Sequence, residues 1–390
     1  MDGEDAPFGA TAAALVRTAY APAGDAAAAA SALDAALGPG PLALVTLFVS
    51  PVGDFDRIAA AMRVARPEAK LVGCTTAGEI GPEGYMSGAV VAVGFPARDF
   101  EAETMLIPDL GALDRQDVAA AALRARAALA LRRPDWTEEC AFLLVDGLSM
   151  KEEALAAGLS AALGPTPFFG GSAGDGLSFR HTAVMAGGYV RNNAAVLTLI
   201  RTRCRLRTFR LDHLKPAATR MVVTSADPAR RVVREINAEP AAREYARLLG
   251  KDPEQLSPFI FAAHPVLVRI GGQHHVRAIR QVAPNGDLVF FSAIDEGLVL
   301  TLAEPTDIAS HLEREFAALA EEGEPAAILA CDCILRRVEA EQKQAVAAVS
   351  RALARRRVVG FNTYGEQFGG AHVNQTLTGL AIYPPEGMKA

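Results

Sequence analysis

The chain has 390 residues, of which 51% are hydrophobic and 22% charged, so it is long enough to bury a large core and too apolar for a disordered protein. Its formal net charge of −6 excludes a general binder of nucleic acids or anionic membranes, because such proteins need clustered positive charge. No apolar run reaches the length of a membrane span, and we expect no secretory signal in the acidic start.

The first part of the chain predicts one helix and then a strand–helix–strand unit. Residues 25–37 have an Ala-rich helical pattern that ends at Gly38-Pro39-Gly40. Residues 42–49 are continuously apolar between two prolines, which is typical of a strand buried on both faces. A helix capped by Asp54 is expected over residues 55–66, then strands over 70–76, 89–95 and 100–106 and a helix over 114–130.

The same order of elements recurs twice. A strand, a helix and a second strand are predicted at 140–145, 151–163 and 194–200, and again at 326–335, 339–355 and 377–383. The stretch between the second and third units has a different pattern. It predicts a strand at 219–224, a further segment at 231–237 and a helix at 240–249. Hairpin strands are then expected at 259–268, 275–282, 288–294 and 297–302, followed by a helix at 307–321. Asn285-Gly286 between two apolar runs is a strong hairpin signal.

A Gly-rich motif follows the helix of each unit. The pattern V-G-x-x-T-x-G-E occurs at 72–79 and at 359–366, and a looser version, G-G-S-A-G-D, occurs at 170–175. Such repetition indicates three related units that bury their apolar faces against one another. The expected fold is α/β with repeated βα units and mixed sheets: an extension over 1–40, an N-terminal α/β domain over 41–245 and a C-terminal α+β domain over 246–385.

Four motifs occur in a family-specific order: L-V-G-C-T-T-A-G-E-I (71–80), F-F-G-G-S-A-G-D-G (168–176), V-R-A-I…N-G-D-L…I-D-E-G (276–297) and G-F-N-T-Y-G-E-Q (360–367). Together they resemble the FIST sensory proteins, with both the N-terminal and the C-terminal domain. The resemblance implies an intracellular module that senses small ligands such as amino acids. The sequence H-V-N-Q-T after the last motif resembles the haem-binding, nitric oxide-sensing branch, which regulates a partner histidine kinase.

Three Gly-rich turns that converge in space would form a polar ligand pocket, because glycines allow positive φ and a close approach to the backbone. The predicted pocket residues are Thr75, Thr76, Ser172, Asp175, Asn362, Thr363, Glu366 and Asn374. The alternative is structural, with glycines that only make tight corners and acids that cap neighbouring turns. No turn matches a nucleotide-binding glycine motif, so a nucleotide is not the expected ligand.

A haem site needs an axial ligand, and the sequence offers seven histidines. His372, just past the third turn, is the predicted ligand of the iron, and His264, in an apolar run before a proline, is the second candidate. The alternative for both is an ordinary loop or core histidine. His274 and His275 are expected at an exposed hairpin tip, and His311 on a helix surface.

Tyr364 and Arg277 complete the predicted cofactor site. Arg277, like Arg280 or residues 355–357, could pair with a haem propionate or a ligand carboxylate, and the alternative is solvated charge. Cys74 lies in the first turn without a histidine near it in sequence, so catalysis there is not expected. The five cysteines, an odd number, are typical of a reduced, cytoplasmic protein.

The first functional hypothesis is a non-catalytic, cytoplasmic protein that binds haem b, senses nitric oxide and regulates a histidine kinase or other signalling output protein. The alternative is a haem-free FIST sensor that binds an amino acid or other small carboxylate through Thr, Asn and Arg side chains. Neither hypothesis involves nucleic acid or a membrane, and the sequence leaves a homodimer open.

Overall fold

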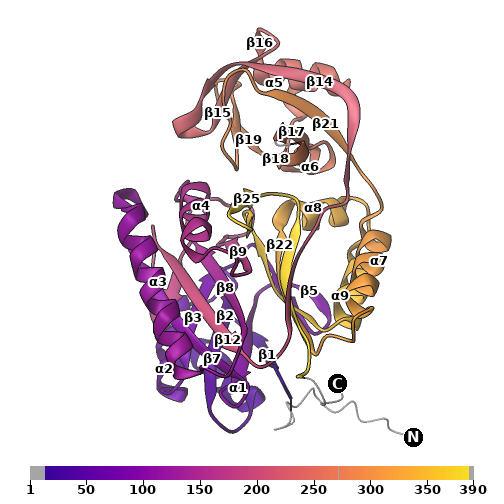
Figure 1. Ribbon diagram of the computed structural model, residues 1–390. Coiled ribbons are helices and arrows are strands. Elements are labelled where there is room, and N and C mark those ends of the chain that lie inside the picture. The colour runs from indigo at the N-terminus through magenta and orange to yellow at the C-terminus, as the bar shows by residue number, and fades with distance from the viewer. Residues whose placement is uncertain (1–13, 271, 386–390) are drawn as a thin grey trace, which may run out of the picture.

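The computed structural model describes residues 14–270 and 272–385. It has two parts, a lower body built from three mixed sheets and an upper lobe built around a fourth sheet (Figure 1). The predicted mixed α/β class is confirmed. Within the described residues, no helix combines the length and the hydropathy that a membrane crossing requires.

The first sheet has the strand order β1-β6-β2-β3-β10-β11. β2 and β3 are parallel, and β6 lies antiparallel to β2. Two helices, α1 and α2, pack on one face of this sheet. The bounds are β1 (Arg17–Pro22), α1 (Ala26–Leu37), β2 (Leu42–Val49), α2 (Phe55–Ala65), β3 (Lys70–Thr75) and β6 (Ala89–Pro96), with β10 (Val184–Ala186) and β11 (Tyr189–Arg191) added at the edge.

The second sheet repeats this plan with the order β7-β12-β8-β9-β24-β25. Its helices α3 and α4 again pack on one face. The bounds are β7 (Phe100–Ile107), α3 (Arg115–Arg132), β8 (Glu138–Val145), α4 (Glu152–Leu163), β9 (Phe168–Ser172) and β12 (Ala195–Thr202), with β24 (Glu366–Phe368) and β25 (Ala371–Val373) at the edge.

The third sheet has the equivalent order β13-β26-β22-β23-β4-β5. The helices α7, α8 and α9 belong to it. The bounds are β13 (Leu206–Leu211), α7 (Ile308–Ala320), β22 (Ala327–Cys333), α8 (Ile334–Gln342), α9 (Val346–Arg355), β23 (Val358–Thr363) and β26 (Leu377–Ile382), with β4 (Glu79–Gly81) and β5 (Gly84–Met86) at the edge.

The three units exchange their hairpins in a cycle. The hairpin after the first Gly-rich turn, β4–β5, pairs with the third sheet; the hairpin of the third unit, β24–β25, pairs with the second; and that of the second unit, β10–β11, pairs with the first. The three predicted repeats are therefore confirmed and are arranged as a pseudo-threefold body. Residues 17–37, which the sequence assigned to an extension, supply the first strand and first helix of unit one.

The sheets of the body share one apolar core. Phe48 of the first unit stacks on Phe361 of the third with ring centroids 4.6 Å apart, and Phe142 stacks on Phe169 within the second at 4.8 Å. All four rings belong to the same buried cluster. Because helices cover the other face of each sheet, the central strands are buried on both faces, which explains their continuous apolar sequences.

The upper lobe is an insertion in the third unit, between β13 and α7, and spans residues 214–305. Its eight-stranded sheet runs β18-β17-β21-β14-β15-β20-β19, with β16 paired to β15. The bounds are β14 (Leu214–Asp227), β15 (Val232–Ile236), β16 (Glu239–Pro240), α5 (Ala241–Leu249), α6 (Pro258–Ala263), β17 (Val266–Ile270), β18 (Gln273–Arg277), β19 (Ile279–Val282), β20 (Leu288–Phe290) and β21 (Val299–Pro305). The boundary predicted at 245/246 lies inside α5.

Two sequence predictions in this region need correction. The strand expected from residue 259 is the helix α6 as far as Ala263, because Pro258 occupies the first helical turn, where a missing N–H costs nothing. The single helix expected over 339–355 is two helices, α8 and α9, separated at 343–345. The hairpin around Asn285-Gly286 is confirmed.

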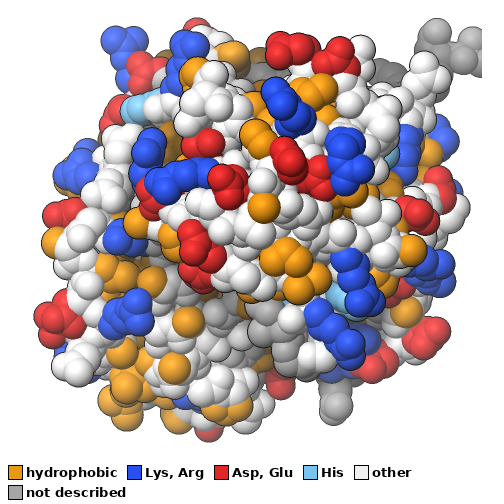
Figure 2. Space-filling model, turned by 90° about the horizontal axis from the view of Figure 1, so that it is seen from above, with side chains coloured by type: hydrophobic (Ala, Val, Ile, Leu, Met, Phe, Trp, Pro, Cys, Tyr) orange, Lys and Arg blue, Asp and Glu red, His pale blue; other side chains and the backbone are white. Residues whose placement is uncertain are grey.

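Seen from above, the molecule carries acidic and basic side chains interspersed with one another (Figure 2).

Candidate functional site

The three Gly-rich turns meet at the centre of the body. Each is joined to the others by backbone hydrogen bonds: Ala77 N to Asn362 O at 2.9 Å, Ser172 N to Gly365 O at 2.8 Å and Gly174 N to Thr75 O at 3.1 Å. The hairpin exchange explains this contact, because each turn passes directly from the strand of one sheet to the edge of another. The predicted convergence of the turns is therefore present in the structure.

The glutamates of the first and third turns have equivalent structural partners. Glu79 accepts a hydrogen bond from the hydroxyl of Thr76 and another from the backbone N–H of Ala89. Glu366 accepts from the hydroxyl of Thr363, three residues before it, and from the backbone and hydroxyl of Thr376, ten residues after it. These carboxyl groups close their own turns, so the structural alternative for them is supported.

Burial changes the proton affinity of Glu366. Its side chain is fully buried, and burial raises its pKa from 4.5 to about 8, although the bonds from Thr363 and Thr376 act in the opposite direction. The group therefore holds its proton near neutral pH. Burial also raises the pKa of Glu79.

The remaining predicted pocket residues are mostly satisfied by protein groups. Asp175 accepts backbone N–H groups of Phe179, Arg180 and His181 at 2.8 Å each, as well as the hydroxyl of Tyr364. Other pocket residues are bonded in the same way: Thr75 to Ala183 N, Ser172 to Gln367 and Asn362 to Arg337. Thr75 and Asp175 also line a cavity of about 600 Å³ beside residues 51–56. The centre is thus a buried polar core that leaves few groups free for a ligand.

Several buried groups without a partner among the described residues lie where the upper lobe rests on the third turn, and others are spread through the body. The Tyr364 ring packs against Phe179 of the second unit and Phe291 of the lobe, with centroids 4.7 and 6.0 Å away. The guanidinium of Arg280 lies 5.7 Å from the Phe179 ring, within cation–π range. This aromatic wall is part of an apolar cluster that joins lobe and body.

Three arginines, Arg231, Arg277 and Arg280, gather beside this wall, and we call them the arginine cluster. Arg231 is anchored, since it donates to Glu152 at 2.7 Å and to the carbonyl of Phe291. The Nε atoms of Arg277 and Arg280 are buried and have no hydrogen-bond partner among the described residues. Burial lowers the pKa of both, and the Arg231 charge lowers it further, whereas Glu153 and Asp295 act in the opposite direction on Arg277 and Tyr364 does so on Arg280.

His372 lies on the third-unit hairpin within reach of the same charges. Its side chain is 4% exposed, and burial, followed by the charges of Arg231 and Arg277, lowers its pKa to about 3. Nδ1 lies 3.3 Å from the amide nitrogen of Gln367, which can only donate, so the proton of the neutral ring is on Nε2. That Nε2–H has no partner in the described part of the chain.

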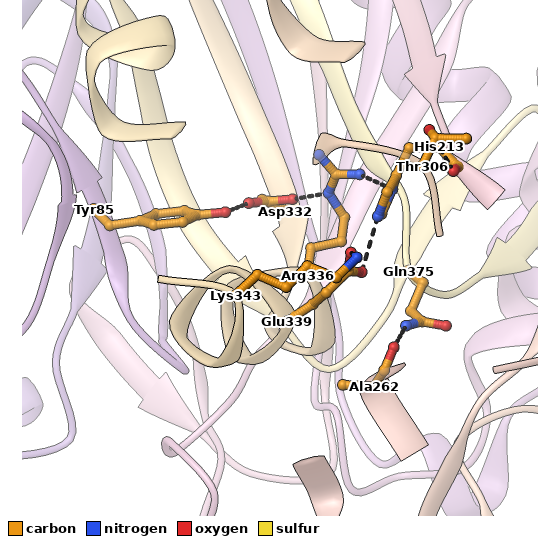
Figure 3. A network of polar contacts seen from close by, with 9 residues as sticks. All are labelled: Tyr85, His213, Ala262, Thr306, Asp332, Arg336, Glu339, Lys343 and Gln375. Carbon is orange, nitrogen blue, oxygen red and sulfur yellow. Dashed lines mark hydrogen bonds and ion pairs between the residues drawn. The ribbon is translucent and has the colours of Figure 1, made fainter. Parts of the chain in front are cut away.

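The segment after His372 connects this site to the lobe. Asn374 donates to the carbonyl of Tyr364 at 3.3 Å, and its Oδ1 is buried without a partner among the described residues. Gln375 donates to the carbonyl of Ala262 at the end of α6, at 2.8 Å (Figure 3). The H-V-N-Q-T sequence that directed attention to this region therefore links the third turn to the upper lobe.

A second connection between lobe and body is a buried ionic network (Figure 3). Tyr85, on the hairpin of the first unit, donates to Asp332, which is held by Arg336 one helical turn later at 2.7 Å. Arg336 also donates to Nδ1 of His213 at 2.8 Å, and His213 Nε2 lies 2.8 Å from Glu339. Since arginine can only donate, His213 carries its proton on Nε2 and donates it to Glu339.

His213 lies where the chain enters the lobe, and its carbonyl accepts both the backbone and the hydroxyl of Thr306, where the chain returns. The network therefore holds both crossing strands to α8. The sequence did not single out His213, because a histidine in a polar segment resembles a surface residue. The available signal was the run of alternating charges along α8, in which Arg336 is followed by Glu339 and then by Lys343 four residues later.

The other histidines occupy structural positions. His264 ends α6, and burial, followed by the charge of Lys251, lowers its pKa. The prediction that His311 lies on a helix surface was wrong. Its side chain is 7% exposed, because it lies on the inward face of α7 next to His213. His274 is exposed and His275 is half-buried. Arg355 and Arg356 pair with Glu313 and Glu324, as expected for helix-end charge.

The residues around His372 can be tested for a haem. A neutral imidazole can bind iron and neighbouring arginines can pair with propionates, but the space available there is too small for a haem. The cavity lined by the adjacent Val373 and Asn374 measures about 30 Å³, which is room for one water molecule. The cavities of about 680 and 600 Å³ are lined by other residues. In this arrangement the space at His372 does not fit a haem.

The cysteines lack the surroundings of a nucleophile. Cys74, Cys140, Cys204, Cys331 and Cys333 are all buried and free. Burial raises the pKa of the Cys74 thiol well above its usual value, so it remains protonated.

Matches to protein-family models show which family the chain belongs to. The FIST N domain model matches residues 43–239, and the FIST C domain model matches residues 241–369. The chain is a member of the FIST family. FIST domains are sensory domains of signal transduction that bind small ligands. A comparison with curated proteins finds no significant match. In this FIST protein the two matched regions meet inside the upper lobe, and the three repeats extend across both.

Proposed function

We propose that this FIST protein senses a small carboxylate, such as an amino acid, which binds between the upper lobe and the third Gly-rich turn. The observation that carries the proposal is the pair of buried Nε atoms on Arg277 and Arg280 without partners among the described residues. Both side chains are half-buried overall, and Arg277 also donates from Nη1 to the carbonyl of Val276 at 3.3 Å. A buried N–H of a charged group without an acceptor is costly, and an anion is the group that would supply one. Arginine is suited to a carboxylate, which it can hold by two parallel hydrogen bonds.

The surroundings offer complementary contacts for the rest of such a ligand. The Nε2–H of His372 is an unused donor, and the hydroxyl of Ser292 is likewise buried and without a partner among the described residues. Tyr364, Phe179 and Phe291 form an apolar wall. A site with a few placed polar groups on an apolar wall, at an interface between two parts of a protein, is typical for small ligands.

The position of the site suggests how binding would be transmitted. Arg277 and Arg280 belong to the lobe, whereas His372 and Tyr364 belong to the body, so a ligand held by both favours the closed arrangement of the two. The proposed recipient of the signal is a partner signalling protein, and a histidine kinase is the partner that the family resemblance favours.

The proposal is tested by thermal unfolding with amino acids and short carboxylates, each paired with its neutral carboxamide. A binding carboxylate raises the melting temperature and its carboxamide does not. Arg277→Gln and Arg280→Gln abolish the increase, whereas Arg269→Gln, an exposed arginine on the adjacent strand, retains it. A carboxylate that stabilises parent and cluster variants equally would refute the proposal.

Haem b with nitric oxide as the signal is the other candidate function. The observation in its favour is the neutral, unpartnered and buried imidazole of His372. Absorption spectra of protein produced with haem supply test it. A Soret band that responds to nitric oxide and disappears in His372→Ala or in His264→Ala would support haem sensing, and an unchanged protein spectrum during haem titration would exclude it.

A further inference from the structure

The largest cavity of those described above, about 680 Å³, is separate from the arginine cluster. It lies where four segments distant in sequence meet: β13, α7, the tip of the β24–β25 hairpin and β18, which contributes His275. A volume of this size lies in the range of small-ligand sites. None of the three cluster arginines lines it.

The cavity wall combines aromatic and aliphatic side chains with cations. The apolar part is made by Phe209, Leu211, Leu319 and Phe368. The cationic part is made by Arg207 and Arg210 on β13, whose ion pairs are loose, at 3.6 Å to Glu322 and 3.6 Å to Asp212.

Glu315 is the acidic residue in the lining; it pairs with Arg314 at 2.9 Å and lies 3.7 Å from Nε2 of His311. With two arginines and one glutamate, the lining carries a net positive charge.

A narrow inner cavity continues from the large one. The two share Arg210 and His275, and the inner one, about 30 Å³, is lined by Asn374. Asn374 is fully buried and its Oδ1 has no partner among the described residues. An unused, buried acceptor at the inner end indicates a place for one donor group of a ligand or for a bound water.

We propose that this outer cavity is a second ligand site, for an amphipathic anion whose ring or chain packs on Phe209 and Phe368 and whose charge pairs with Arg207 and Arg210. The site does not depend on the proposed function at the arginine cluster, because the two share no residue. They are connected by the β24–β25 hairpin, whose tip lines the outer cavity while His372 lies beside the cluster.

A pair of fluorescent probes tests the outer site. 8-Anilinonaphthalene-1-sulfonate is an aromatic anion, and N-phenyl-1-naphthylamine is the same ring system without the sulfonate. The parent binds one sulfonate probe per chain, at least tenfold more tightly than the neutral probe. Arg207→Gln/Arg210→Gln reduces sulfonate binding about tenfold and leaves the neutral probe unchanged, because only the charge is removed.

Two controls separate the outcomes. Arg356→Gln removes an arginine paired with Glu324 outside the cavity and retains sulfonate binding. Arg277→Gln/Arg280→Gln also retains it, whether or not the carboxylate proposal holds. Sulfonate binding that survives the Arg207/Arg210 change, or that is lost on changing Arg277 and Arg280, overturns the outer site. The single variant Arg207→Gln, at a side chain 43% exposed, keeps the fold intact if the double variant unfolds.

Discussion

Glu366→Gln isolates the effect of the buried carboxyl group in the third turn. In the folded protein the pKa of this group is raised from 4.5 to about 8, mainly by burial. The folded chain therefore binds more protons than the unfolded chain between these two values. It follows that this group stabilises the fold below about pH 4.5, and that its contribution is lost as pH rises through 8.

The size of the effect follows from the shift. At about 1.4 kcal/mol per pKa unit, a rise from 4.5 to about 8 corresponds to roughly 3 to 5 kcal/mol of unfolding free energy. Gln resembles the protonated acid in shape and cannot ionise. At pH 5 the variant should match the parent closely, and at pH 8 it should be more stable by an amount approaching this value.

Urea unfolding at pH 5 and pH 8, followed by circular dichroism, measures the difference between the two proteins. Buried histidines with lowered pKa, such as His213 and His311, titrate in both proteins and cancel in that difference. Glu304→Gln, an exposed carboxylate on β21, is the control and should follow the parent. Equal pH dependence in parent and Glu366→Gln, or a large loss of stability at pH 5, would refute the reasoning.

Three further predictions concern the surroundings of the site. Arg336→Ala removes the positive charge that compensates the buried carboxylates of Asp332 and Glu339, and it should lower the unfolding free energy measured in urea by about 3 to 5 kcal/mol. Lys343→Gln, at a side chain 41% exposed, should change the unfolding free energy little. Gly365→Ala should destabilise by at least ~1 to 3 kcal/mol, because φ is +157° and a Cβ would lie 2.3 Å from His372, while Gly158→Ala in open space on α4 should stabilise slightly. The imidazole resonances of His372 should show no protonation in NMR titrations above about pH 4; a midpoint near 6.5 would contradict its burial beside arginines.

The pseudo-threefold body has a consequence for ligand sensing. The three Gly-rich turns are equivalent in topology, but the upper lobe is inserted in the third unit, between β13 and α7. The lobe also contacts the other two units, since Ala77 of the first turn and Phe179 of the second unit belong to the apolar cluster that joins lobe and body. The asymmetry of the proposed site therefore comes from the insertion and from the segment that follows His372.

Local features of the sequence predicted the repeated strands and helices. Continuous apolar runs indicate buried strands without reference to the rest of the fold, so β2, β8 and β22 agree with expectation. Helix α6 was missed, because its short apolar sequence has no period that separates strand from helix. The exchanged hairpins were also missed, since strands of three residues carry too little pattern and their partners lie in another unit.

For the proposed site, the sequence singled out residues that the fold brings to one interface, but it did not show the state of their side chains. These residues are His372, Tyr364, Asn374 and Arg277. The sequence also predicted ligand roles for Thr76, Thr363 and Glu366, whereas in the structure Thr76 bonds to Glu79 and Thr363 bonds to Glu366 within their own turns.

The sequence by itself determined the three repeats, the FIST resemblance and the turns at which they meet, because glycine spacing and apolar runs are local properties of the chain. Only the tertiary structure decided which polar groups are left without a partner. Arg277 and Arg280 resemble solvated strand charges until the lobe folds over the third turn and removes water from their Nε atoms. Burial depends on contacts between distant segments, and it is burial that turns an ordinary arginine into a binding group.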